Sequence, residues 1–177
     1  MSERDEKSGA EFHELRGKEG MEKISDLVRN IRIAMMSTVD GDGVIRSRPM
    51  ATQNEPFSGT LWFLTRLSSE KVSEIHRNGM VTLDYADPAN SKYITLRGTA
   101  SVSKDRAKIE EMWNPMYKAW FPIGKEDPEI AVLSVDVTEG EYWDANSSKL
   151  ILGIRYIAAA ITGGAIPLGE SGHLEVA

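Results

Sequence analysis

The stretch FLTRLSSEKVSEIH, residues 63–76, places hydroxyl and cationic side chains where a predicted strand is followed by a predicted helix. Thr65 ends the strand, Ser69 precedes the helix and Lys71 falls in its first turn. A helix N-terminus carries unsatisfied N–H groups and a partial positive charge, so it readily binds an anion. A lysine in the first turn opposes the helix dipole unless an anion compensates it. The pattern indicates a phosphate site; the alternative is an ordinary serine cap beside a solvated lysine.

Two arginines form a second candidate anion site. Arg46 and Arg48 stand two residues apart in RSRPM, so alternation along a strand places them on one face. Like charges side by side repel unless solvent or a shared anion separates them. Pro49 cannot donate a ladder hydrogen bond, which indicates an edge position or a place where the backbone meets a ligand. The alternative is a solvated edge strand whose charges discourage aggregation.

The elements that must position these residues are predicted from apolar periodicity and turn signals. A hairpin joins residues 34–39 to 44–52 through DGDG, because Asp-Gly is a strong hairpin signal. Further strands are predicted at 61–65, 80–86, 92–103 and 130–144. Helices are predicted at 10–30 (one or two), from Ser68 or Ser69 to about Asn78, at 105–121 with a kink or break at Pro115, and at 148–161.

This order favours antiparallel hairpins over regular alternation of strand and helix. We therefore predict a mainly β fold, a β-barrel with flanking helices and six or seven antiparallel strands. With no repeat or linker, residues 1–177 are expected to form a single domain, whose ends at 1–9 and 163–177 are flexible.

Composition excludes several classes of function. The net charge of −6 disfavours nucleic acid as a partner. The chain has no Cys, and its three His have no zinc-like spacing, so no metal site is predicted. The N-terminus is charged from its second residue and no apolar run approaches about 18 residues. We expect a soluble, cytoplasmic protein without a membrane partner.

The ordered set SRPMAT, LWFLTRLSSEKVSEI, YITLRGTASVS and EYWD resembles the FMN-binding split barrel of the pyridoxamine 5′-phosphate oxidase superfamily, above all its general stress protein branch. The resemblance covers roughly residues 20 to 155. It implies a homodimer that binds two FMN molecules at the subunit interface. The cofactor-binding residues that it implies are Arg48 at the phosphate, Pro49, Met50 and Ala51 along the isoalloxazine, Leu64 and Thr65 along the ribityl and phosphate side, Ser69 and Lys71 at the phosphate, Tyr93 from the other subunit, and Trp143 near the flavin.

Two departures from the family pattern bear on activity. Glu70 stands where the oxidases carry a basic residue, and DANSSKLILG after Trp143 lacks the Arg and His that grip pyridoxal phosphate. We therefore expect an FMN-dependent oxidoreductase acting on an unknown small substrate, and not pyridoxamine phosphate oxidation itself. The alternatives are a non-catalytic flavin-binding stress protein that stores or senses FMN, and a barrel for haem or a deazaflavin.

No catalytic acid or base is identified from the sequence. Asp84 and Tyr85 are adjacent on a predicted strand, so they face opposite sides and cannot act as a pair. Trp113, Trp120 and Phe121 could wall a pocket over the flavin, but core or dimer-interface packing is the favoured interpretation.

Overall fold

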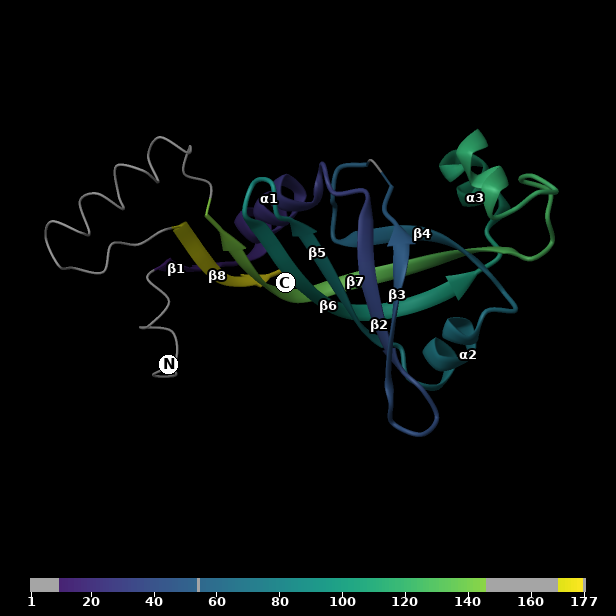
Figure 1. The fold of residues 1–177 in the computed structure, drawn as a ribbon, viewed down its shortest axis with the longest axis horizontal. Coiled ribbons are helices and arrows are strands. Elements are labelled where there is room, and N and C mark those ends of the chain that lie inside the picture. Colours follow the sequence, from purple (N-terminus) through teal and green to yellow (C-terminus); the bar gives the residue numbers. More distant parts are fainter. Residues whose placement is uncertain (1–9, 54, 146–168, 177) are drawn as a thin grey trace, which may run out of the picture.

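The computed structural model describes residues 10–53, 55–145 and 169–176 (Figure 1). The strands in these ranges are β1 (Ala10–Leu15), β2 (Ile33–Val39), β3 (Ile45–Ala51), β4 (Thr60–Arg66), β5 (Met80–Asp87), β6 (Lys92–Ser103), β7 (Ile130–Asp144) and β8 (Gly169–Glu175). The helices are α1 (Gly17–Val28), α2 (Glu70–Arg77), α3 (Arg106–Met112) and the 3-10 helix η2 (Pro115–Ala119). None of these helices is long and apolar enough to cross a membrane.

The strands form one branched sheet that curls into a split barrel. Its order is β1-β8-β7-β6-β5-β2-β3, and β4 pairs with β7 beside this path. The branch exists because β7 is long: Ile130–Asp136 pairs with β4, and Glu139–Asp144 pairs with β8. At the other end β3 approaches β4 without a ladder between them. The predicted mainly β, antiparallel barrel is confirmed, although the described residues form eight strands, and β1 pairs with β8 in parallel.

A bulge at Gly98 bends the barrel wall. The β6–β7 register shifts between Arg97 and Gly98, where a Cβ on Gly98 would collide with the Asp136 carbonyl. An extra residue on one strand bends it and increases its twist, and glycine permits the close approach of the two backbones. Because of this bend, β7 pairs with β4 along its first part and with β8 along its last part.

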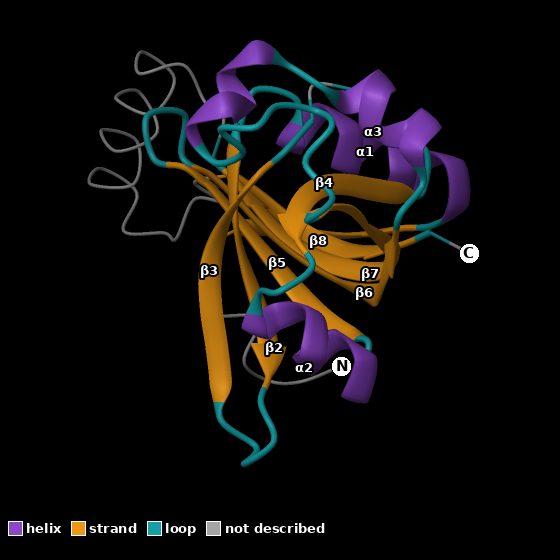
Figure 2. Cartoon of the chain, turned by 90° about the vertical axis from the view of Figure 1, so that its right-hand side faces the viewer, coloured by secondary structure: helices purple, strands orange, loops and turns teal. Residues whose placement is uncertain are grey.

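Two apolar clusters hold the layers together. The first fills the barrel, and the alternation predicted for β6 is confirmed because Ile94 and Leu96 are buried inside it. The second, which we call the α3 cluster, comprises Ile109, Met112, Phe121, Ile130 and Val132, with Trp62, Leu64, Trp113 and Tyr117 packed against it. In Figures 1 and 2, α1 and α3 lie on the upper side of the sheet, whereas α2 lies lower, beside the β2–β3 hairpin.

The predictions for the ends of the chain need correction. The first part of the predicted helix at 10–30 is strand β1, and only Gly17–Val28 is helical. Within the tail predicted to be flexible, Gly169–Glu175 forms strand β8, whose Leu174 is fully buried. Each strand depends on pairing with a segment far away in the sequence, which local periodicity does not report. Residues 1–9 and the predicted helix at 148–161 lie outside the described residues.

The break predicted at Pro115 is confirmed, since α3 ends at Met112 and η2 begins at Pro115. The proline has no N–H to continue the helical ladder. The break turns η2 away from α3, so Met116 and Trp120 reach solvent whereas Met112 stays in the α3 cluster.

Candidate functional site

Four predicted residues come together where β4 meets α2. We call this group, Arg48, Thr65, Ser69 and Lys71, the hydroxyl–cation cluster. The Lys71 Nζ donates to the Thr65 Oγ1 at 3.3 Å, and the Thr65 Oγ1 lies 3.3 Å from the Ser69 Oγ. Arg48 reaches the same place from β3, close enough for its charge to act on Lys71. The turn between β4 and α2 thus brings together Thr65, Ser69 and Lys71, which are close in sequence, and β3 contributes Arg48.

Ser69 occupies the N-cap position of α2, but its side chain does not cap the helix. Its hydroxyl donates instead to the Arg66 carbonyl at 2.7 Å. The first-turn N–H groups of α2 therefore receive no bond from the cap side chain, which suits an anion-binding helix start.

Lys71 is partly buried beside another positive charge, which disfavours its charged form. Burial lowers the pKa of its ammonium group, and the nearby positive charge of Arg48 lowers that pKa further. Among the described residues Lys71 forms no ion pair within 4.0 Å, although the charge of Glu74 acts on it weakly in the opposite direction. A phosphate at this position would relieve both causes, because an opposite charge favours the protonated amine.

Arg48 is held by two partners that the sequence analysis missed. Its Nη2 donates to the Glu74 Oε2 at 2.8 Å, and its Nη1 donates to the Thr38 Oγ1. The Thr38 hydroxyl in turn donates to the Glu74 Oε2 at 2.5 Å. Glu74 is buried on the inward face of α2, next to Ile75. A charged residue at an apolar helical position was the signal in the sequence that could have found it.

The pKa of the Glu74 carboxyl reflects two opposing effects. Burial alone would raise that pKa. The hydrogen bonds from Thr38 and Arg48, with the Arg48 charge, outweigh burial and hold the pKa below its usual value. Glu74 is therefore a buried carboxylate that fixes the Arg48 side chain.

The remaining residues predicted on β3 and β4 are dispersed. Met50 is buried in the barrel core, Pro49 is exposed on the other face of β3, and Ala51 is half-buried at the strand end. Leu64 alternates with the buried Thr65, and its side chain packs against the α3 cluster on the opposite face of β4. Arg46 is exposed and pairs with Asp40, with 2.9 Å between Nε and Oδ2. Only Arg48 of the two arginines joins the cluster.

Tyr93 and Trp143 lie side by side on the outside of the sheet. They are register partners on β6 and β7, and 43% and 45% of their surfaces are exposed. The cluster residue Thr65 is buried, and Arg48 is directed toward the buried Thr38 and Glu74. One chain therefore does not bring the two aromatic side chains to its own hydroxyl–cation cluster.

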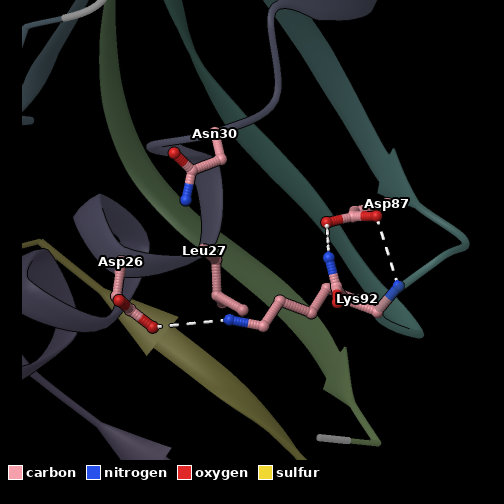
Figure 3. Close-up of a pocket in the computed structure, with 6 residues that line it drawn as sticks. Asp26, Leu27, Asn30, Asp87 and Lys92 are labelled. Atoms are coloured by element: carbon pink, nitrogen blue, oxygen red, sulfur yellow. Dashed lines mark hydrogen bonds and ion pairs between the residues drawn. The ribbon is translucent and has the colours of Figure 1, made fainter.

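Two other hollows contain no residue of the hydroxyl–cation cluster. A pocket of about 220 Å³ lies between α1 and the β5–β6 turn (Figure 3), and in it Lys92 pairs with Asp26 at 3.6 Å between Nζ and Oδ2. A larger groove of about 560 Å³ lies between the α1–β2 connection, the end of β3 and η2. In the described part of the chain no three His, Asp or Glu side chains are grouped to hold a metal ion.

The rejection of Asp84 and Tyr85 as an acid–base pair is confirmed. Asp84 faces solvent, whereas Tyr85 is 2% exposed in the barrel core. Burial raises the pKa of the Tyr85 phenol to about 12. The two side chains lie on opposite faces of β5.

Known proteins resemble this chain in sequence. A family model described as "Pyridoxamine 5'-phosphate oxidase like" matches residues 19–167. The protein bli-3 of Neurospora crassa is 30% identical over 145 residues, which cover 75% of this chain and 68% of bli-3.

Solved structures give the same fold. A putative general stress protein 26 from Jannaschia sp. CCS1 matches with a TM-score of 0.72 and 24% identity, over 85% of this chain and 94% of that one. A general stress FMN/FAD binding protein from Xanthomonas citri matches with a TM-score of 0.63 and 27% identity, over 75% and 92% of the two chains.

Proposed function

Because this chain belongs to the pyridoxamine 5′-phosphate oxidase-like family, we propose that it is a flavoprotein that binds FMN in the hydroxyl–cation cluster. The relative from Xanthomonas citri is described as binding FMN or FAD, which supports a flavin as the ligand. FMN is the flavin proposed here because its terminal phosphate matches two cations, two hydroxyls and a helix N-terminus.

One observation carries this proposal: a half-buried lysine lies beside an arginine, and no anion among the described residues pairs with the lysine. Desolvating a cation costs free energy unless an opposite charge compensates it. Arg48 would hold the phosphate with the guanidinium N–H groups that do not bond to Glu74 and Thr38, and Lys71 would add a point charge. Thr65 and Ser69 would add hydroxyl donors.

When bound, FMN supplies hydride and single-electron transfer. The chain's own residues bind and orient it. Backbone groups of β3 from Pro49 to Ala51 would run along the ring, and the Leu64 backbone and the Thr65 side chain would line the ribityl side. Glu74 and Thr38 keep the Arg48 guanidinium in place before the cofactor arrives, which lowers the entropy cost of binding.

We also propose that the active form is a homodimer. The outer sheet face exposes Ile33 and Met35 on β2, Tyr93 on β6 and Trp143 on β7, each between 41% and 50% exposed. A sheet face that exposes several large apolar side chains is typical of an interface. Dimerisation would cover it and would carry Tyr93 and Trp143 of one subunit toward the flavin of the other.

The proposed activity is that of an FMN-dependent oxidoreductase acting on a small substrate. A second candidate is a protein that stores or senses FMN without turnover, and the absence of Arg and His from DANSSKLILG favours it. Stopped-flow oxidation of a nicotinamide donor separates the two. The enzyme must consume the donor faster than an equal concentration of free FMN, whereas the storage protein does not.

The site itself is tested by FMN titration, followed by the absorption and fluorescence of the flavin. Wild-type protein is expected to retain about one FMN per chain. The Arg48→Ala/Lys71→Ala variant loses two charge-assisted phosphate bonds of about 1.5–3 kcal/mol each, so its Kd rises by roughly two to four orders of magnitude.

Two further variants serve as controls for this test. Arg48→Ala also removes the charged partner of the buried Glu74, so Lys71→Gln alone, which spares that pair, must weaken FMN binding by at least about tenfold. Arg46→Ala removes the neighbouring exposed arginine and should bind FMN like the wild type. Unchanged affinity in both Lys71 variants would place the phosphate elsewhere.

A further inference from the structure

The groove of about 560 Å³ combines positive charge with aromatic surface. Arg29 and Arg32 line it from the α1–β2 connection, Ala51 and Gln53 from the end of β3, and Tyr117 and Trp120 from η2 and its C-cap. Its volume is in the range of small-ligand sites. It does not include any residue of the hydroxyl–cation cluster.

The two arginines have no ion-pair partner among the residues that the structure describes. Neither Arg29 nor Arg32 forms an ion pair within 4.0 Å among the residues that the structure describes, although acidic residues outnumber basic ones in the chain by 27 to 21. Arg29 is the C-cap of α1, where the helix dipole favours a cation. The dipole does not account for Arg32, which follows the helix and whose carbonyl accepts from the Thr52 N–H at 2.9 Å.

The aromatic wall opposite is held in place although it faces solvent. Trp120 is 60% exposed, yet its carbonyl accepts from the Arg66 Nη2 at 2.8 Å, which ties this turn to the end of β4. The Tyr117 ring lies 6.2 Å from the Trp120 ring, and the Gln53 Nε2 donates to the Tyr117 hydroxyl oxygen at 2.5 Å. An exposed indole on a tethered backbone, beside a second ring, offers a planar ligand a surface to stack on.

We propose that this groove binds a planar aromatic anion, such as an aryl carboxylate, as the second ligand of the flavin site. The arginines would pair with the carboxylate, and Tyr117 and Trp120 would contact the ring. The groove begins at Ala51, the residue at which the proposed flavin-contacting segment of β3 ends. Only this link to the flavin rests on the proposed function; the anion site stands on its own geometry.

The experiment measures binding of 2-naphthoate and of its neutral counterpart 2-naphthalenemethanol by calorimetry, to the whole chain with and without FMN. We expect one naphthoate per chain and affinity for the alcohol at least about tenfold weaker. Arg29→Gln/Arg32→Gln should lose at least about tenfold in naphthoate affinity while binding FMN like the wild type. Trp120→Leu should weaken both probes, because stacking does not depend on charge.

Lys118→Gln is the matched control, since it removes an exposed cation of η2 that does not line the groove, and it should bind naphthoate unchanged. Equal affinity for acid and alcohol, or unchanged binding by the arginine variant, overturns the inference. So does competition between naphthoate and FMN, because the groove would then be the flavin's own pocket. If the chain binds naphthoate but not FMN, the anion site is supported and the proposed function is wrong. If the chain binds FMN but not naphthoate, the proposed function is supported and the anion site is wrong.

Discussion

At the scale of single residues, the hydroxyl–cation cluster is organised around charges that the protein leaves partly uncompensated. Lys71 is half-buried beside Arg48, and both burial and repulsion lower its pKa. Arg48 is fixed by the buried carboxylate of Glu74 and the hydroxyl of Thr38. The protein therefore bears an electrostatic cost that a phosphate would relieve, and this cost is measurable by titration.

The first prediction concerns the ionisation of Lys71. Its pKa should lie below the usual lysine value in the FMN-free protein and rise when FMN binds, because the phosphate stabilises the ammonium form. By linkage, FMN affinity should fall as the pH rises through the pKa of Lys71 in the free protein. NMR titration of ¹³C-labelled lysine measures the shift, and flavin fluorescence measures the affinity.

Lys71→Arg is the matched control for this pH dependence. Arginine stays protonated throughout this pH range, so the variant should lack the Lys71 contribution, and the difference between the two profiles isolates it. A Lys71 pKa that FMN leaves unchanged would contradict the proposed phosphate site.

At the scale of elements, α2 is fastened to the β2–β3 hairpin through one buried carboxylate. Glu74 of α2 accepts from Thr38 of β2 and from Arg48 of β3, so the three elements meet at a single side chain. The helix is short and forms its N-terminus immediately after β4, where Thr65 and Ser69 lie. The position of the hydroxyl–cation cluster therefore depends on this attachment.

The second prediction is that Glu74→Gln destabilises the protein. At neutral pH the free energy of unfolding should fall by about 1–3 kcal/mol, because hydrogen bonds to a charged acceptor are weakened. The folded-state pKa of Glu74 is lowered, so its contribution is complete above the unfolded-state pKa and is lost as the pH falls through the folded-state value. The difference from the wild type should therefore shrink in acid.

Urea denaturation at neutral and acidic pH measures this difference. Glu70→Gln, which changes an exposed carboxylate on the same helix, should alter stability little at either pH. If Glu74→Gln were as stable as the wild type at neutral pH, the carboxylate would not be what attaches α2 to the hairpin.

At the scale of the whole molecule, the branched sheet exposes several large apolar side chains on its outer face. β2, β5, β6 and β7 are consecutive in the sheet, and the outward residues of these strands include Met35, Tyr93 and Trp143. The same arrangement keeps the aromatic pair away from the cluster of its own chain. A second copy of the chain accounts for both facts, since it would cover the face and supply the aromatic side chains.

The third prediction is that the protein sediments as a dimer at micromolar concentrations and that Tyr93→Glu/Trp143→Glu sediments as a monomer. Charges placed in an apolar interface remain unpaired and desolvated, which opposes association. Because the partner subunit would complete the flavin site, the monomeric variant should also bind FMN more weakly. Analytical ultracentrifugation with and without FMN measures both effects.

The control for this prediction is Ile123→Glu. Ile123 is 72% exposed but lies in the loop between η2 and β7, away from the outer sheet face, so its variant should remain dimeric. Wild-type protein of monomeric mass, or a double variant that still dimerises, would leave the outer face without a role in assembly.

Much of the barrel could be predicted because its signals are local. Asp-Gly turns mark the β2–β3 hairpin, and alternation marks β6, whose bounds agree with the predicted range. Thr65, Ser69 and Lys71 lie within seven residues of one another, and a strand followed by a helix brings their side chains together wherever the rest of the chain folds. The sequence by itself therefore determined these elements and most of the hydroxyl–cation cluster.

Tertiary structure decided the features that join distant segments. β1 and β8 are strands because each pairs with the other, 159 residues apart at Ala10 and Gly169, and neither has a strong local signal. Glu74 meets Arg48 only because α2 packs against the β2–β3 hairpin, and Arg32 and Trp120 line one groove only because the α1–β2 connection and η2 both reach the end of β3. Periodicity reports which face of an element is buried, but it does not report which partner covers that face.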